Sequence, residues 1–252
     1  DSGMIEGSSI ISQMTLALGY PKLGHYFNIG LEVSGFVHIL DIGFNSLQNK
    51  SHLIKQIEYS DIKNIGPKEF KNDNKYTRGK LICIAGSKGH TGAAILAVQS
   101  AYKTGAGIIK LITPDSLNAI FENSIFDAIT IPINDKNSGF LSGDNTGDIL
   151  NEIKWADVIL IGPGLLSDST DWLTSVMKNI KIPLILDASG FKPLIENKIQ
   201  IDELPKETIL TPHIAEFSKI FNIDMKYVKN DTISEVKKII SILDGRILIL
   251  KG

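Results

Sequence analysis

The stretch LICIAGSKGHTGAA, residues 81–94, joins an apolar run to a glycine-rich turn and then to the start of a helical pattern. The apolar run, Lys80–Ala85, is continuous rather than alternating, which is typical of a strand covered on both faces. The small residues after it let backbone N–H groups approach a ligand, and a helix N-terminus favours an anion. Residues 80–104 therefore predict a buried strand, a tight loop and a helix over Ala93–Thr104.

The same alternation continues along the rest of the chain. Strand–helix alternation predicts right-handed βαβ units in an α/β fold with a layered, doubly wound, mostly parallel sheet. Ligands bind such sheets at the carboxyl ends of the strands. Further strands are expected at Gly107–Ile112, Ala128–Ile133, Asp157–Ile161, Pro183–Leu186, Thr208–Leu210 and Arg246–Leu250, and further helices at Trp172–Asn179 and Ser234–Leu243.

Composition excludes some classes of protein. The chain has 252 residues, of which 43% are hydrophobic and 21% charged, and its net charge is −2, as expected of an ordinary globular protein. This balance gives no electrostatic reason to expect nucleic acid or an anionic membrane as a partner. No apolar run reaches the roughly 18–20 residues that span a bilayer. The single cysteine, Cys83, favours a reducing compartment.

The chain divides into three segments by pattern. Residues 1–48 are β-rich, with candidate strands at Met14–Leu18 and Gly35–Ile42, and residues 49–78 are a polar, Lys/Asn-rich connector. Residues 79–252 carry the regular alternation. Both ends are expected to be cut, because the sequence starts at Asp1 without methionine and stops just after a strand-like run.

Four glycine-rich or polar loops follow four of the predicted strands. The first, residues 86–94, fits neither the P-loop nor the GxGxxG pattern, and by itself a tight turn explains it equally well. In the third, Asp187 could orient a hydroxyl or a metal-bound water, or simply cap a helix. In the fourth, His213 and Glu216 are spaced to share one helix face. Four such loops at one sheet edge favour a ligand site. The second, third and fourth loops are, in this order, Gly162-Pro163-Gly164-Leu165, Asp187-Ala188-Ser189-Gly190 and Thr211-Pro212-His213 with Glu216-Phe217.

These motifs resemble a known family in their order and spacing. Together with Thr104-Gly105-Ala106-Gly107 and Leu250-Lys251-Gly252, they resemble the NAD(P)H-hydrate dehydratase domain over residues 53–252, a ribokinase-like fold. The leader, with Asp1-Ser2-Gly3, Pro21-Lys22-Leu23-Gly24 and Asp41-Ile42-Gly43, is similar to the end of the NAD(P)H-hydrate epimerase domain. That domain precedes the dehydratase in many bacterial bifunctional proteins.

The resemblance implies an activity in nicotinamide nucleotide repair. NADH hydrate and NADPH hydrate would be the substrates, ADP or ATP with Mg²⁺ would supply the phosphoryl group, and phosphate elimination would restore the ring double bond. A cytoplasmic homo-oligomer is expected, with no metal ligand among the protein side chains. The implied substrate-binding residues are Thr91, Gly92, Ala93, Gly162, Gly164, Asp187, His213 and Glu216, and Lys251 and Gly252 would begin the nucleotide-binding loop.

Two departures from the family pattern limit these expectations. The family's Gly-Thr-Gly-Asp motif, with its catalytic aspartate, is expected beyond Gly252, so no catalytic residue is assigned. The similar Asn145-Thr146-Gly147-Asp148 precedes the Gly162 loop, and Asp148 is interpreted as an ordinary helix-start or turn residue. No epimerase activity is expected from residues 1–48.

Two other functions stay open. Another ribokinase-like kinase, for a thiazole or pyrimidine alcohol, would share the fold and the anion-binding loop. A catalytically incomplete nucleotide-binding fragment would bind without turnover. The loop at residues 91–94, the Thr-Pro-His-x-x-Glu segment at 211–216 and the epimerase-like leader argue against the kinase. The expected absence of the catalytic aspartate from residues 1–252 favours the incomplete fragment for this stretch of sequence.

Overall fold

The computed structural model describes residues 3, 5, 7–44, 54–63, 73–167 and 169–252. The chain divides into two compact units, one of residues 1–66 and 226–235 and the other of residues 67–225 and 236–252. The division predicted from the sequence, at residues 48 and 78, stays a prediction, since residues 45–53 and 64–72 lie outside the described ranges.

The first unit contains a small parallel sheet. Strands β1 (Met14–Leu18) and β2 (Phe36–Leu40) pair in parallel, from Met14 opposite Phe36 to Leu18 opposite Leu40. Both strands fall within the stretches predicted for them. The chain crosses between them through η1 (Leu23–His25) and α1 (Ile29–Val33), because parallel strands need a crossover connection. These short helices, and α2 (Tyr59–Ile62), were not predicted.

The second unit is built on a seven-stranded sheet in which every neighbouring pair is parallel, so the predicted doubly wound α/β sheet is confirmed. The strand order is β5-β4-β3-β6-β7-β8-β9. The last strand is shorter than expected, at two residues instead of five. The strands are β3 (Lys80–Ile84), β4 (Ile108–Pro114), β5 (Ile129–Ile133), β6 (Val158–Ile161), β7 (Leu184–Leu186), β8 (Thr208–Leu210) and β9 (Ile247–Leu248).

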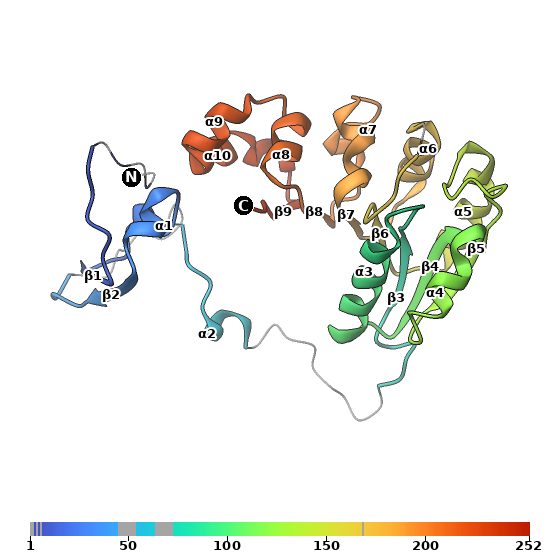
Figure 1. The fold of residues 1–252 in the computed structure, drawn as a ribbon, viewed down its shortest axis with the longest axis horizontal. Coiled ribbons are helices and arrows are strands. Elements are labelled where there is room, and N and C mark those ends of the chain that lie inside the picture. The colour runs from blue at the N-terminus through green and yellow to red at the C-terminus, as the bar shows by residue number, and fades with distance from the viewer. Residues whose placement is uncertain (1–2, 4, 6, 45–53, 64–72, 168) are drawn as a thin grey trace. The chain divides into compact units, whose positions relative to one another are not determined.

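Helices cover both faces of this sheet. Figure 1 shows α3 (Thr91–Lys103) and α4 (Asn118–Glu122) on one side of it, and α6 (Asp171–Asn179), α7 (Lys192–Ile195) and α8 (Ile214–Ile220) on the other. Helix α5 packs against α6. The remaining helical elements are η2 (Asp115–Leu117), η3 (Gly143–Asn145), α5 (Thr146–Glu152), η4 (Ile153–Trp155), η5 (Ala188–Phe191), η6 (Ile201–Glu203), α9 (Met225–Asn230) and α10 (Thr232–Leu243).

The apolar runs are continuous because helices cover both faces of the sheet, so that a strand such as β3 is buried on both faces. In β3, Cys83 and its face-mates pack under α3 and α4, while Ile82 and Ile84 point to the opposite face and are also fully buried. Every position after Lys80, the first residue of β3, is therefore buried and apolar. The cluster under α3 and α4 consists of Leu81, Cys83, Ala85, Ala94, Val98, Ile109, Leu111, Leu117, Phe121 and Ile125.

Burial of Cys83 in this cluster predicts an unreactive thiol. Burial raises the pKa of the Cys83 thiol to about 12, so almost no reactive thiolate forms near neutral pH. We expect an aromatic disulfide reagent to leave the folded chain unlabelled and to label one thiol per chain in denaturant, since Cys83 is the only cysteine. Rapid labelling without denaturant would contradict the buried position.

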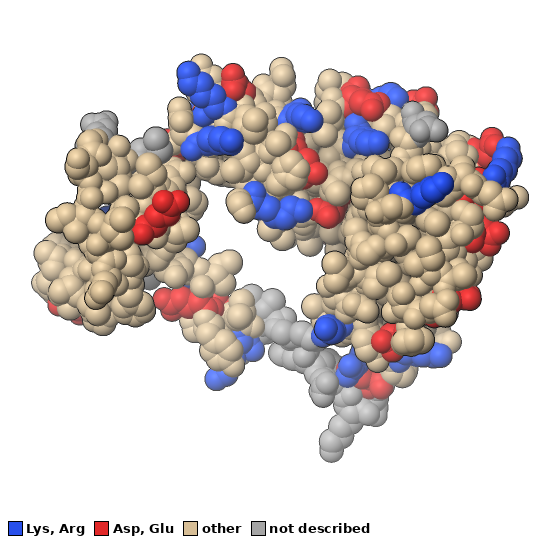
Figure 2. All heavy atoms as spheres, in the orientation of Figure 1, with Lys and Arg blue, Asp and Glu red and all other residues tan. Residues whose placement is uncertain are grey.

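The surface carries charges of both signs. On the face shown in Figure 2, Lys/Arg and Asp/Glu side chains are interspersed, and neither kind forms a continuous patch. The described residues of that face form no basic stripe of the kind that binds nucleic acid. Within the described ranges, no helix has the length and apolar character that crossing a membrane requires.

The strand order creates a switch point in the sheet. From β3 the chain moves outward through β4 and β5, then returns to place β6 on the other side of β3. The loops that leave β3 and β6 therefore run to opposite faces. In open α/β sheets, ligands bind in the crevice between two such loops, outside the carboxyl ends of the strands.

Candidate functional site

The first two predicted loops meet at this switch point. Gly86 N–H donates to the carbonyl oxygen of Pro163 at 2.9 Å. The fully buried Ser87 donates its hydroxyl to the carbonyl oxygen of Gly164 at 2.7 Å and accepts the N–H of Leu166 at 3.3 Å. The loop after β3 and the loop after β6 are thus one hydrogen-bonded unit. Ser87 was not among the predicted site residues.

Two glycines let the backbones come this close. Gly162 has φ +120°, and a Cβ there would lie 1.8 Å from the carbonyl oxygen of Asp187. Gly164 has φ +63°, and its Cβ would lie 2.3 Å from the carbonyl oxygen of His90 and 3.0 Å from the Cβ of Ala93. Both positions demand glycine, by conformation and by space. Gly162 and Gly164 therefore lie between the loops that carry the other predicted residues.

The first turn of α3 faces this junction. Thr91, Gly92 and Ala93 occupy it, and His90 precedes the helix without a hydrogen bond from its side chain to the turn. The space beside Gly92 is open, since a Cβ there would meet nothing within 4 Å. The N–H groups of a first helical turn have no partner within the helix, so this turn can donate to an anionic or polar ligand.

Asp187, at the end of β7, connects the third and fourth loops. Its Oδ1 accepts the Thr211 hydroxyl at 2.7 Å and forms an ion pair with the Lys251 ammonium at 2.6 Å. Asp187 occupies the N-cap position of η5, one of its two sequence interpretations, but its side chain makes no cap hydrogen bond there. The Asp187 carboxylate instead binds the side chain of Lys251, which lies 64 positions later in the sequence. Thr211 belongs to the fourth predicted loop but was not predicted as a site residue.

His213 and Glu216 lie at the start of α8, where a helix was expected, and form a reciprocal cap that their spacing did not predict. His213 Nδ1 accepts the N–H groups of Ala215 and Glu216 at 3.1 and 3.3 Å. Glu216 Oε2 accepts the N–H of His213 at 2.9 Å. A parallel backbone bridge pairs His213 with Lys251 beyond the end of β9. The histidine therefore lies beside the segment expected to begin the nucleotide loop.

A hollow of about 580 Å³ lies over the α3 side of the sheet. Of the predicted site residues it includes Asp187 and Lys251, with Thr211 beside them. Its floor is apolar and includes Leu160 and Ile185. Charged residues line both ends of this hollow, with Arg78 and Lys80 by the amino end of β3 and Asp187 and Lys251 at the carboxyl edge. Among the described residues, no group of three or more His, Cys, Asp or Glu side chains could hold a metal ion.

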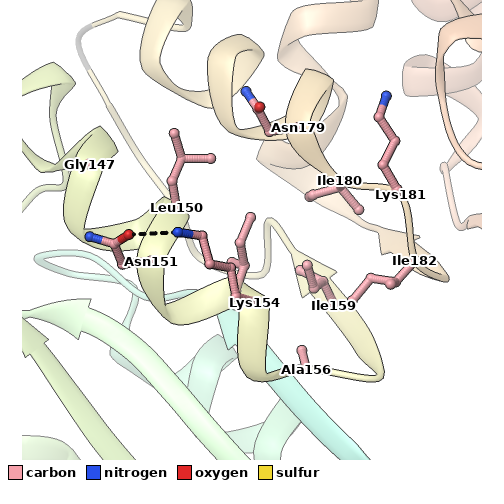
Figure 3. A pocket seen from close by; sticks show the side chains of 11 residues that line it. Gly147, Leu150, Asn151, Lys154, Ala156, Ile159, Asn179, Ile180, Lys181 and Ile182 are labelled. Carbon is pink, nitrogen blue, oxygen red and sulfur yellow. Dashed lines mark hydrogen bonds between the residues drawn. The ribbon is translucent and has the colours of Figure 1, made fainter.

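A second pocket, of about 570 Å³, lies by the amino ends of β6 and β7, near Ala156 and Ile182 (Figure 3). It contains none of the predicted residues. Its floor includes the buried Ile159 and Ile180, and at its rim Lys154 donates to Asn151 Oδ1 at 3.0 Å. Because ligands of doubly wound sheets bind at the other edge, we do not assign the site here. Asp148 lies in the first turn of the neighbouring α5, the helix-start position expected for it.

A third loop, which was not predicted as part of the site, supports the glycine-rich loop after β3. Asp135, which is 6% exposed, accepts the Ser116 hydroxyl and the Gly139 N–H, each at 2.6 Å, and the Ser116 N–H at 3.1 Å. Gly139 in turn accepts the N–H of Lys88 at 2.9 Å. Asp135 thus holds the loop after β5 against the loop that contains Ser87. The turn-rich composition of residues 134–139 indicates a loop, but not its partner.

This network predicts an acid-sensitive contribution to stability. Burial raises the pKa of the Asp135 carboxyl, but hydrogen bonds from Ser116 and Gly139 outweigh burial and leave that pKa below its usual value. A carboxyl with a lowered pKa stabilises the fold above its unfolded pKa, about 3.9, and this contribution is lost as pH falls through the folded value. Replacing Asp135 by Asn should lower the free energy of unfolding at neutral pH by about 1–3 kcal/mol.

Urea unfolding at neutral pH and at about pH 3.5, below the unfolded carboxyl pKa, measures this effect. The deficit of Asp135→Asn should begin to shrink at the acid pH, because the wild-type chain starts to lose its advantage below the unfolded pKa and loses the rest as pH falls through the lower folded pKa. Asp127→Asn, at an exposed carboxyl, is the matched control and should change little. A deficit that is the same at both pH values would contradict the role of the ionised carboxylate.

The sequence model of the NAD(P)H-hydrate dehydratase family matches residues 81–252. The chain is similar to bifunctional NAD(P)H-hydrate repair enzymes from Moorella thermoacetica, at 25% identity over 256 residues, and from Thermofilum pendens, at 27% over 255. Each alignment covers 100% of this chain and 48% of the relative. The chain therefore spans about half the length of the curated relatives it matches.

Solved structures share the fold of the second unit. An ADP/ATP-dependent NAD(P)H-hydrate dehydratase from Bacillus subtilis, co-crystallised with ATP and Mg²⁺, has a TM-score of 0.61 at 23% identity and covers 77% of this chain and 65% of its own. A ribokinase-like superfamily protein from Enterococcus faecalis has a TM-score of 0.62 at 23% identity, covering 73% and 61%. The fold is therefore ribokinase-like, as the motifs implied.

Proposed function

The chain belongs to the NAD(P)H-hydrate dehydratase family, and we propose that it carries the substrate-binding part of an enzyme that dehydrates NADH hydrate and NADPH hydrate with ADP or ATP. The observation that carries this proposal is the hydrogen-bonded junction of the Ser87 and Gly164 loops at the switch point of the sheet. The family match spans this junction. A general ribokinase-like kinase is the weaker alternative, because the family match names the dehydratase.

The chain's own groups suggest how the hydrate would be held. The first turn of α3, at Thr91, Gly92 and Ala93, offers backbone donors that the helix itself does not use. Gly162 and Gly164 keep side chains out of the junction, so a planar ring or a sugar could approach the backbone. Such donors are fixed by secondary structure and need little reorganisation when a ligand arrives.

Lys251 and Gly252 would contact the nucleotide, and Asp187 would hold the Lys251 side chain until the nucleotide binds. The Lys251 side chain is 47% exposed and makes one ion pair, so its ammonium can reach a phosphate. The nucleotide, when bound with Mg²⁺, supplies the phosphoryl group that makes the substrate hydroxyl a better leaving group. Within the described residues Asp187 and Glu216 are carboxylates of this edge, and neither belongs to a cluster that would bind the cation alone.

We propose a cytoplasmic location for this activity, consistent with the single, buried, reduced Cys83. A homo-oligomer, and the absence of nucleic acid among the partners, stay predictions. The epimerase remnant also stays a prediction. It is supported by relatives described as bifunctional that align over the whole chain.

The test is recovery of reduced-nicotinamide absorbance from NADPH hydrate in the presence of ADP or ATP. A dehydratase regains absorbance and releases phosphate, with no phosphorylated product left. A kinase for another alcohol leaves a stable phosphate ester and regains nothing. Titration calorimetry of the 252-residue chain with NADPH hydrate separates binding from turnover. A chain that neither binds the hydrate nor supports its dehydration refutes the proposal.

A further inference from the structure

The imidazole of His213 has its two nitrogens in different environments. Nδ1 accepts two backbone N–H groups, from Ala215 at 3.1 Å and from Glu216 at 3.3 Å. A ring nitrogen that accepts hydrogen bonds must present its lone pair, so in the neutral ring the proton lies on Nε2. The backbone of α8 thus selects one tautomer of His213.

Glu216 completes this arrangement from the other side. Its Oε2 accepts the main-chain N–H of His213 at 2.9 Å, and its Oε1 lies 3.4 Å from Nε2. The Glu216 side chain is 17% exposed, whereas that of His213 is 55% exposed. The carboxylate is therefore turned toward the histidine and largely shielded, while part of the imidazole remains open to a ligand.

The segment that carries His213 is also fixed on both sides. Lys251 N–H donates to the carbonyl oxygen of Pro212 at 2.9 Å, and the Thr211 hydroxyl donates to Asp187. The histidine consequently has a defined position as well as a defined tautomer. A site residue held this way can orient a substrate without a conformational cost at the time of binding.

We propose that Glu216 is a positioning residue: by accepting the main-chain N–H of His213 it keeps the imidazole against the backbone donors of α8, which hold it as the Nε2–H tautomer. His213 then acts on the hydrate as a hydrogen-bond donor and not as the base that removes the hydroxyl proton. The identity of the ligand rests on the function proposed above; the tautomer does not. A base would need a free lone pair on a ligand-facing nitrogen, and the lone pair of His213 faces the backbone of α8. Glu216, predicted to bind substrate, acts through His213 instead.

The tautomer can be read from ring nitrogen chemical shifts of the ¹⁵N-labelled 252-residue chain, at a pH about two units above the ordinary histidine pKa of about 6.5. We expect a lone-pair shift for Nδ1 and a protonated shift for Nε2, with His213→Gln used to assign the signals. In Glu216→Ala the two tautomers should mix, and in Glu216→Gln the wild-type pattern should return, because an amide oxygen also accepts the main-chain N–H. A protonated Nδ1 in the wild type, or an unchanged pattern in Glu216→Ala, overturns the proposal.

Hydrate binding distinguishes the donor role from a structural one. Glu216→Ala and His213→Gln should each weaken NADPH hydrate binding about tenfold, the effect of one lost hydrogen bond, while Glu216→Gln stays close to wild type. Glu203→Ala is the matched control, since Glu203 caps the unrelated η6 through the N–H of Gln200. Unchanged affinity in His213→Gln overturns the donor role. Absence of hydrate binding in the wild type refutes the proposed ligand and leaves the tautomer to be judged by its own measurement.

Discussion

Replacing Gly162 by alanine should lower the free energy of unfolding by at least about 2 kcal/mol, the combined effect of a strained backbone and an overpacked contact. The new Cβ would lie 1.8 Å from the carbonyl oxygen of Asp187 and 2.5 Å from the nitrogen of Gly190. Both contacts are with backbone, so no side chain can rotate away. The φ of +120° is in addition one that residues with a Cβ rarely adopt.

The same substitution should also separate the loops of the site. Gly162 lies between the Ser87–Gly164 junction and Asp187, so any shift that relieves the clash moves one loop away from the other. We therefore expect Gly162→Ala to abolish measurable binding of NADPH hydrate even below the unfolding temperature. Chemical unfolding and titration calorimetry on the same preparation measure the two effects.

Gly92→Ala is the matched control for the unfolding measurement. A Cβ at Gly92 would meet nothing within 4 Å, and the residue lies in the first turn of α3. Alanine there should leave stability unchanged or raise it by up to about 1 kcal/mol, because glycine has more conformational freedom to lose on folding. If Gly162→Ala were as stable as Gly92→Ala, the close approach of the loops would be wrong.

The sequence predicted local features well because their signals are local. Continuous apolar runs located the strands, and helical period located α3, α6 and α10 to within a few residues. The short β9 is an exception, since Ile247 and Ile249 are about half exposed and the apolar pattern alone does not show where pairing stops. The small helices between β1 and β2 were missed because they have too few residues to show a period.

The site depended on contacts that no local pattern contains. The four loops were predicted as a group, yet the ion pair of Asp187 with Lys251 joins residues 64 positions apart. The order of the strands, which places β6 beside β3, follows from packing of the whole sheet. Asp135 acts on the glycine-rich loop through Gly139, and nothing in its own neighbourhood indicates that partner. The family resemblance supplied part of this long-range information, since it indicates which loops form one site.

Replacing Lys251 by alanine should weaken ADP binding by about 10- to 150-fold. A hydrogen bond to a charged group contributes about 1.5–3 kcal/mol, and the loss of that free energy corresponds to this range of affinity. The expectation rests on the proposed function. The Lys251 side chain is 47% exposed and Asp187 holds its ammonium at the carboxyl edge, so the ammonium is placed to exchange a carboxylate for a phosphate. Titration calorimetry with ADP measures the affinity of both chains.

Lys206→Ala separates this local contact from the general effect of removing one positive charge. Lys206 also forms an ion pair, with Asp244, and lies before β8, at the opposite end of that strand from Thr211. It should therefore change ADP affinity less than about twofold, since exposed charges farther than a Debye length of about 8–10 Å from a ligand are largely screened. An equal loss in both variants would mean that Lys251 contributes only to the overall charge. A loss confined to Lys251→Ala, unaffected by moderate salt, would place the phosphates of the nucleotide against the carboxyl ends of β7, β8 and β9.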